Sequence, residues 1–252
     1  SVDPKSISDE IVDLVEKKLI EYDKSFKNKL ERFHYVSPLF FGLAAYYQKV
    51  NKEKSEEYFN LGNQEIFNTL RYNSFQYQKH IKASMEFYEQ SYKGFENSSD
   101  KGSSNFFIVG SPRSGTTLIE SMITANNQVF AGGELFSAKN MVGNFLRYKE
   151  TDTQKATNDF CQKYLKRTDF MKKDLKYIVD KLPENFLYIG FLLKFLPRSK
   201  FIRVFRNPWD TAISLYKQRY VQNIPYSASF FNIGVFMANF EAINIYWNKV
   251  IQ

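Results

Sequence analysis

The stretch Asn105–Ile123, NFFIVGSPRSGTTLIESMI, decides the fold of this chain. Its first residues, NFFIV, form an apolar run typical of a buried strand, and the residues from Thr117 onward resemble the start of a helix. The loop between them has glycines at positions 110 and 115, which is the spacing of a phosphate-binding loop. We therefore predict a strand, an anion-binding loop and a helix, in that order.

This loop lacks the lysine that a nucleoside triphosphatase places on the terminal phosphates. Thr116 stands in the lysine position, and the positive charge lies upstream at Arg113. Backbone amides at the helix N-terminus, the helix dipole and the hydroxyls of Thr116 and Thr117 would converge on one phosphate group. The alternative interpretation is an ordinary Gly/Ser turn between a strand and a helix. The context favours an anion site that needs no metal.

Composition limits the class of protein. The chain has 252 residues, 43% of them hydrophobic, which is typical of a globular protein with a sizeable core. Its formal net charge of +8 favours an anionic ligand or an acidic partner. Because the basic residues are scattered and form no dense run, we predict no nucleic-acid partner.

The single cysteine, Cys161, allows no internal disulfide, and a reducing cytoplasm is the simplest compartment. The most apolar stretch, residues 230–245, is interrupted by Asn232, Asn239 and Glu241, so we predict a packed helix and no membrane span. We predict no signal peptide in the N-terminal residues of this sequence.

Two regions follow from hydrophobic periodicity. Residues 1–98 read as an all-α, tetratricopeptide-like region, in which Ser37 and Pro38 open a helix that runs to residue 50 and a second helix covers 54–72. Gly42 and Ala45 are its predicted small packing positions. One helical hairpin cannot bury its own face, so it would dock on the second region or on further repeats upstream.

A polar linker at 96–104 leads into the second region, residues 105–252, where strands and helices alternate. We predict strands near 105–110, 128–131, 176–181 and 200–205, and helices near 116–125, 136–149, 153–170, 185–197, 208–220 and from 228. This alternation indicates an α/β fold with a P-loop-like, mostly parallel sheet covered by helices on both faces.

Charged residues fall at the carboxyl ends of three predicted strands, where ligands bind in such sheets. They are Arg113, Lys181 and Arg206. Asn207 would cap the helix after Arg206, and Ser214 lies two turns into that helix, so Arg206 and Ser214 would form a second anion pocket. The alternative is a helix cap beside a surface arginine.

These motifs resemble those of the sulfotransferases. Residues 111–117 look like their 5′-phosphosulfate loop, and Arg206 with Ser214 looks like their 3′-phosphate motif. The segments around Gly132, Glu134 and Lys181 are similar to those of the tyrosylprotein sulfotransferases and of bacterial sulfotransferases that follow tetratricopeptide repeats.

The resemblance implies a sulfotransferase with 3′-phosphoadenosine 5′-phosphosulfate as donor and adenosine 3′,5′-bisphosphate as product. The implied donor-binding residues are Ser111, Pro112, Arg113, Ser114, Gly115, Thr116, Thr117, Arg206 and Ser214. Lys181 and Arg113 would stabilise the leaving phosphate, and Glu134 would be the base, because the two histidines lie in the helical region. Glu120, inside a helix, and Asp180, expected to pair with a neighbouring basic residue, are poorer candidates.

The implied acceptor is a hydroxyl of a protein tyrosine, a saccharide, a lipid head group or a small molecule, or an amine. The helical repeat could recruit a protein partner. The family domain continues past the long helix that ends at Gln252, so we expect a truncated domain with weak or absent turnover. Two alternatives stay open: a P-loop nucleotide kinase, and a noncatalytic binding module with a degenerate sulfotransferase domain.

Overall fold

The computed structural model describes residues 8–22, 26–92, 100–140, 153–220 and 224–251. The chain forms two compact units, Ser1–Ser74 with Ala212–Phe236, and Phe75–Thr211 with Met237–Gln252. Neither boundary falls at the linker that the sequence suggests, and the division into residues 1–98 and 105–252 stays a prediction.

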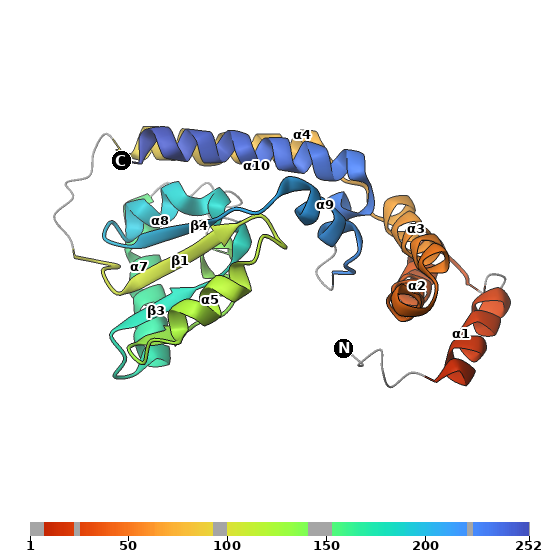
Figure 1. The fold of residues 1–252 in the computed structure, drawn as a ribbon. Coiled ribbons are helices and arrows are strands. Elements are labelled where there is room, and N and C mark those ends of the chain that lie inside the picture. The colour runs from red at the N-terminus through yellow and green to blue at the C-terminus, as the bar shows by residue number, and fades with distance from the viewer. Residues whose placement is uncertain (1–7, 23–25, 93–99, 141–152, 221–223, 252) are drawn as a thin grey trace. The chain divides into compact units, whose positions relative to one another are not determined.

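A parallel four-stranded sheet forms the centre of the second unit (Figure 1). Its strands are β1 (Asn105–Gly110), β2 (Val129–Ala131), β3 (Tyr177–Asp180) and β4 (Lys200–Val204), in the order β2-β3-β1-β4. All three pairings are parallel, with Phe107 opposite Asp180 and Gly110 opposite Val204. The predicted α/β fold is confirmed, and each strand lies within two residues of its predicted bounds. Because the strands are parallel, the residues that follow β1, β3 and β4 share one edge.

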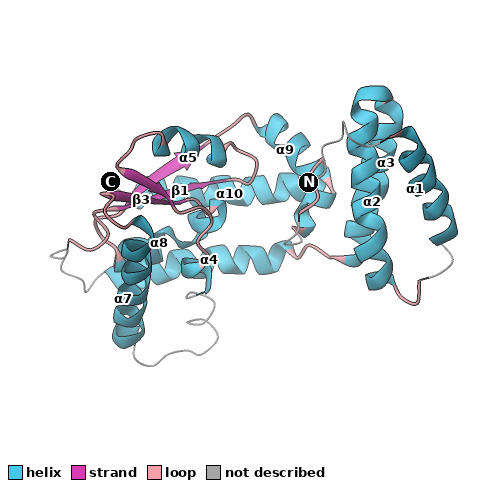
Figure 2. Ribbon diagram, turned by 90° about the horizontal axis from the view of Figure 1, so that it is seen from below, coloured by secondary structure: helices cyan, strands magenta, loops and turns pink. Residues whose placement is uncertain are grey.

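Helix α5 (Thr116–Thr124) covers one face of the sheet. Ile119 and Ile123 of α5 pack on a buried cluster of Ile108, Val179 and Val204, one from each of three strands. Figure 2 shows α5 on one side of the strands and α7 (Thr153–Lys172) and α8 (Ile189–Phe195) on the other. A strand with both faces covered must be apolar throughout, which explains the NFFIV run of β1.

Aromatic residues fill the opposite face. The ring of Phe107 in β1 stacks on Tyr164 of α7 and on Phe201 of β4, with centroids 6.0 and 5.1 Å apart. Trp247 of α10 (Phe230–Val250) donates its indole N–H to the carbonyl of Phe186 at 2.9 Å. The helix α4 (Ser74–Tyr92) also belongs largely to this unit.

Three predicted helices differ in detail from the structure. The helix predicted at 185–197 begins as the 3₁₀ helix η2 (Pro183–Tyr188) and continues as α8. Helix α9 (Pro208–Tyr216) ends before the predicted residue 220. Residue 136 is a turn, residues 137–140 are helical, and residues 141–149 of the helix predicted at 136–149 lie outside the described residues.

Helices make up most of the first unit, which contains α1 (Asp9–Tyr22), α2 (Lys29–Val50) and α3 (Lys52–Thr69). A core of buried side chains joins α2 and α3: Phe33, Phe41, Ala44, Phe59 and Ile66, together with Ala228 of η3 (Pro225–Ala228). The predicted helical hairpin is therefore present, with α3 at 52–69 instead of 54–72. Its assignment as a tetratricopeptide repeat stays a prediction.

The start of the first helix of the hairpin was predicted wrongly. Helix α2 does not begin at Ser37. It begins after Asn28, whose side chain accepts the Glu31 N–H at 2.9 Å, and Pro38 lies inside it. Proline removes one helical hydrogen bond, and the buried apolar face of α2 offsets this loss.

The small residues that permit close packing also differ from those predicted. A Cβ at Gly42 would meet nothing within 4 Å, whereas one at Gly62 would lie 2.8 Å from the ring of Phe41. Ala44 is fully buried and Ala45 is not. The close approach of α2 and α3 therefore depends on Gly62 and Ala44.

Candidate functional site

The predicted anion-binding loop, residues 111–115, joins β1 to α5. Arg113 and Gly115 have φ angles of 69° and 100°, so two loop residues are left-handed. Left-handed residues alternating with right-handed ones turn successive backbone N–H groups into a concave, anion-binding nest. A Cβ at Gly115 would meet nothing within 4 Å, so backbone conformation, not lack of space, calls for glycine there.

Ser114 is the most informative residue of the loop. Its side chain is 6% exposed, and its hydroxyl oxygen is buried with no hydrogen-bond partner among the described residues. A Cβ at Gly110 would lie 2.8 Å from that oxygen and 2.8 Å from the Val204 carbonyl. An unpaired buried hydroxyl costs about 1–3 kcal/mol, which a bound anion would offset. The residues present therefore fit an anion.

Other predicted donor-binding residues surround Ser114. Ser111 and Thr116 are buried, and the Ser111 carbonyl accepts the Ser114 N–H at 3.1 Å. Pro112 is buried and its carbonyl accepts the Ser111 hydroxyl at 3.1 Å. Thr117 is exposed in the first turn of α5. The side chain of Arg113 is exposed as well, at the tip of the loop.

Arg206 reaches this loop from the end of β4. Its Nη1 donates to the Arg113 carbonyl at 3.3 Å, and its Nη2 lies 3.9 Å from a carboxylate oxygen of Asp210. Asn207 caps α9 as predicted, accepting the N–H groups of Trp209 and Asp210 at 2.9 and 3.3 Å. The structure thus brings Arg206 and the loop together.

Ser214 belongs to the other compact unit, where it lies in α9. Its pairing with Arg206 stays a prediction.

Lys181 and Glu134, both predicted to be catalytic, form an ion pair. Lys181 Nζ lies 2.9 Å from Glu134 Oε1, and the two side chains are 9% and 43% exposed. Lys181 follows β3 directly, and its backbone N–H donates to the Gly133 carbonyl at 2.8 Å. A buried ammonium group needs a partner of opposite charge, and Glu134 supplies one while facing solvent. The pair offers a cation and a base side by side.

Glu120 is a residue of the site that sequence reasoning set aside. It lies in the second turn of α5, 8% exposed, and its Oε1 accepts the Gly133 N–H at 3.0 Å. Thr116 and Glu120, four residues apart, are the buried residues of α5. The signal available in the sequence was this spacing of four residues, which places both side chains on the same face of α5.

Asp180 has different partners from those predicted. It is 1% exposed, and its carboxylate accepts the Tyr164 hydroxyl at 2.9 Å and the Asn185 amide at 3.3 Å, so its direct side-chain partners are neutral. The backbone N–H of Leu135 also lies near this carboxylate and favours its ionised form. Burial raises the pKa of Asp180 to about 7, although these hydrogen bonds oppose the shift.

The two histidines lie in helices that precede β1 in the sequence, as expected. His34 is exposed in α2. His80, in α4, packs edge-on against Tyr188, with ring centroids 6.0 Å apart, and burial lowers its pKa.

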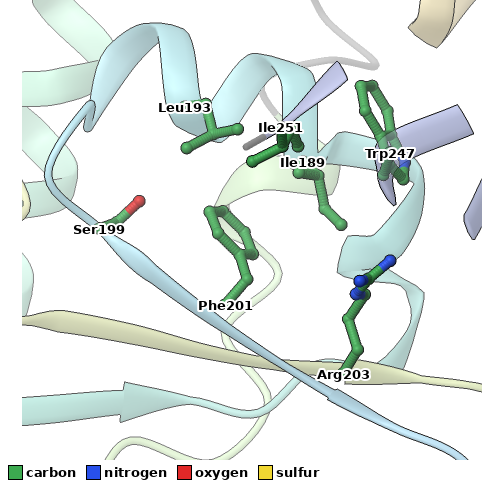
Figure 3. A pocket seen from close by; sticks show the side chains of 7 residues that line it. All are labelled: Ile189, Leu193, Ser199, Phe201, Arg203, Trp247 and Ile251. Atoms are coloured by element: carbon green, nitrogen blue, oxygen red, sulfur yellow. The ribbon is translucent and has the colours of Figure 1, made fainter. Parts of the chain in front are cut away.

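A pocket of about 220 Å³ lies on the opposite face of β4 from α5 (Figure 3). Its walls are Ile189, Leu193, Ser199, Phe201, Arg203, Trp247 and Ile251. Arg203 donates to the Asn244 carbonyl at 3.3 Å, so its guanidinium also braces α10. None of the predicted site residues lines this pocket.

Two absences hold for the described part of the chain. Within it, no group of three or more His, Cys, Asp or Glu residues could hold a metal ion. None of its helices has the length and apolarity needed to cross a membrane.

The parallel sheet and the loop between β1 and α5 define an α/β protein with a candidate anion site at the carboxyl ends of its strands. The chain belongs to the sulfotransferase family, whose model matches residues 105–248. It is also similar to an uncharacterized protein of Aquifex aeolicus (strain VF5), with 33% identity over 161 residues. The match covers 57% of this chain and 21% of that relative, so the chain spans about a fifth of the relative's length. No solved structure matches.

Proposed function

We propose that this protein transfers the sulfuryl group of 3′-phosphoadenosine 5′-phosphosulfate to a hydroxyl or amine of an acceptor. Membership of the sulfotransferase family supports sulfuryl transfer in general. The observation that carries the proposal is the Ser114 hydroxyl, which is buried without a hydrogen-bond partner among the described residues, in a left-handed loop that precedes a helix. A sulfated 5′-phosphate would supply the acceptor that this hydroxyl lacks.

In this proposal the loop binds the 5′-phosphosulfate. The backbone N–H groups of residues 114–117, the Ser114 and Thr116 hydroxyls and the helix dipole contribute to that site. Thr116, in place of a lysine, leaves no ammonium group on a terminal phosphate, which favours a sulfated nucleotide over a triphosphate with its metal. Arg206, with Ser214, binds the 3′-phosphate.

The transfer is an in-line displacement at sulfur. The bond from sulfur to the 5′-phosphate oxygen breaks, and that oxygen keeps the electron pair. A new bond forms between sulfur and the acceptor oxygen, whose proton passes to Glu134. Lys181 and Arg113 stabilise the negative charge on the leaving phosphate. A loose transition state of this kind depends mainly on positioning and charge.

The ion pair between Glu134 and Lys181 is consistent with these roles. It holds the base and the cation 2.9 Å apart at the carboxyl edge of the sheet. A sulfuryl group carries less negative charge than a phosphoryl group, so the proposed reaction requires no metal.

The acceptor is proposed as a protein tyrosine, a saccharide or a small molecule with a hydroxyl group. Glu134 and Lys181 resemble the corresponding residues of tyrosylprotein sulfotransferases, which favours tyrosine. We further propose that the helical hairpin recruits a protein partner and that the protein works in the cytoplasm of a bacterium.

Calorimetric titration tests the donor site without knowledge of the acceptor. Adenosine 3′,5′-bisphosphate and adenosine 5′-monophosphate, which differ only in the 3′-phosphate, are titrated into the wild type and into Arg206→Gln. For the wild type, we expect the bisphosphate to bind about 10- to 100-fold more tightly than the monophosphate, since one charge-assisted contact contributes about 1.5–3 kcal/mol. Arg206→Gln should reduce this preference to less than about threefold.

Arg198→Gln is the matched control, because Arg198 precedes β4 and is exposed beside Asp100. It should keep the wild-type preference. Tighter binding of ATP with Mg²⁺ than of the bisphosphate would overturn the proposal. Transfer of ³⁵S from labelled donor to phenolic, saccharide and peptide acceptors would then identify the acceptor class.

A further inference from the structure

Two buried carboxylates, Glu120 and Asp180, lie on either side of the turn that carries Glu134. Neither has a role in the reaction proposed above. Glu120 is 8% exposed and Asp180 is 1% exposed. Because buried carboxylates are rare and costly, their partners indicate what they do.

Glu120 holds the turn from the side of the anion-binding loop. Its Oε1 accepts the N–H of Gly133 at 3.0 Å. Glu120 lies one helical turn after Thr116, the first residue of α5. This hydrogen bond therefore connects the helix that begins at the loop to the residue immediately before Glu134.

Asp180 holds the same turn from the side of β3. The backbone N–H of Leu135, the residue immediately after Glu134, lies near the Asp180 carboxylate. Tyr164 and Asn185 fix the carboxylate itself, at 2.9 and 3.3 Å. Asp180 also directly precedes Lys181 in the sequence. It therefore adjoins Lys181 along the chain and lies near the residue that follows Glu134.

The backbone of the turn has little freedom between these two anchors. The Gly132 N–H donates to the Val179 carbonyl at 2.8 Å, and the Lys181 N–H donates to the Gly133 carbonyl at 2.8 Å. A Cβ at Gly132 would lie 2.5 Å from the Val179 carbonyl oxygen, and Gly133 has a φ of 64°. Both glycines are needed for this conformation.

We propose that Glu120 and Asp180 are positioning residues that hold Glu134 against Lys181 and tie this pair to the helix of the anion-binding loop. The inference rests on the proposed function for the roles of Glu134 and Lys181. We call the contacts of Glu120 and Asp180 with the turn around Glu134 the clamp. The geometry of this clamp does not depend on the proposed function. Precise placement of a base and a cation raises the rate of the chemical step more than it changes substrate binding.

Hydrogen exchange tests the clamp directly. Glu120→Ala removes the acceptor of the Gly133 N–H, whereas Glu120→Gln keeps an amide oxygen at the same place. We expect exchange of the Gly133 amide to accelerate at least about tenfold in Glu120→Ala and less than about threefold in Glu120→Gln. Met122→Ala, on an exposed position of α5, is the matched control and should leave the Gly133 amide unchanged.

Asp180→Ala and Asp180→Asn form the second pair of variants, with the Leu135 amide as the readout. Asparagine keeps an acceptor oxygen and alanine does not. Exchange of the Leu135 amide should accelerate in the alanine variant and stay near the wild-type rate in the asparagine variant. Unchanged exchange of both the Gly133 and Leu135 amides in the alanine variants would overturn the inference.

Kinetics with the sulfated donor distinguish positioning from a general loss of structure. We expect Glu120→Ala to lower kcat about tenfold or more with the donor KM within about threefold, and Glu120→Gln to restore kcat. Equal kcat values in wild type and Glu120→Ala, with exchange at Gly133 accelerated, would also overturn it. A wild type that neither binds adenosine 3′,5′-bisphosphate nor transfers sulfate would refute the proposed function alone, because the exchange measurements still decide the clamp.

Discussion

Replacement of Asp180 by Asn should remove a large part of the pH dependence of folding stability. Several groups face the Asp180 carboxyl: Tyr164 and Arg167 from α7, Glu120 from α5, and the Asn185 amide from η2. Burial is the largest influence and raises the pKa from its ordinary value of 3.8 to about 7. The folded chain therefore keeps a proton on Asp180 over a pH range in which the unfolded chain has lost it.

The sign and size of the effect follow from proton linkage. Between the two pKa values the folded state binds one more proton than the unfolded state, so its stability falls as pH rises. Each pH unit costs about 1.4 kcal/mol, or on the order of 4 kcal/mol across the whole window from 3.8 to about 7. Below pH 3.8 both states are protonated, above pH 7 both are ionised, and the contribution no longer changes.

Urea denaturation at pH values from 4.5 to 7.5 measures this contribution. We expect the free energy of unfolding of the wild type to fall relative to that of Asp180→Asn as pH rises, because asparagine does not titrate. Carboxyl ¹³C chemical shifts of Asp180 give its pKa independently. Parallel stability curves for the two proteins, or a carboxyl that titrates near pH 4, would refute the reasoning.

Four further substitutions test the backbone and a helix cap by urea denaturation. Gly115→Ala should lower the free energy of unfolding by about 1–2 kcal/mol from its left-handed conformation alone. Gly110→Ala should lower it more, because its Cβ would lie 2.8 Å from a backbone carbonyl. Equal losses in the two variants would show that space at Gly110 is not limiting. Asn28→Ala should cost about 1 kcal/mol by removing the cap of α2, and no loss would show that α2 does not depend on its cap. Gly62→Ala should cost about 1–3 kcal/mol, because its Cβ would overlap a phenylalanine ring of α2; a stabilised variant would contradict the tight packing of this hairpin.

The positions of the strands were predictable because local pattern and global environment agree. The run of β1 is apolar at nearly every position, and its Phe107, Ile108 and Val109 are fully buried in a sheet covered on both faces. The start of α2 was not predictable in the same way. Ser37 and Pro38 have the local signature of a helix start, but packing against α3 keeps the helix continuous through the proline.

The candidate site also has features that the sequence predicts and contacts that it does not. The sequence gives the loop, Arg206, Lys181 and Glu134 as residue types at strand ends, and the parallel sheet brings strand ends together. The hydrogen bond from Gly133 to Glu120 depends on how α5 packs beside the turn, which hydrophobic periodicity does not specify. The same is true of the neutral partners of Asp180, since a sequence does not reveal which side chains share its buried surroundings.

Arg206 decides whether one nucleotide can connect the two proposed phosphate sites. The parallel pairing of Gly110 with Val204 places Arg206, two residues past β4, at the same edge of the sheet as the loop. Its contact with the Arg113 carbonyl meets the requirement that a doubly phosphorylated adenosine imposes on this residue. The ion pair with Asp210 spans 3.9 Å between exposed side chains and is worth about 0–1 kcal/mol. A phosphate offers a stronger charge-assisted bond, so it would displace Asp210 from Arg206 at little cost.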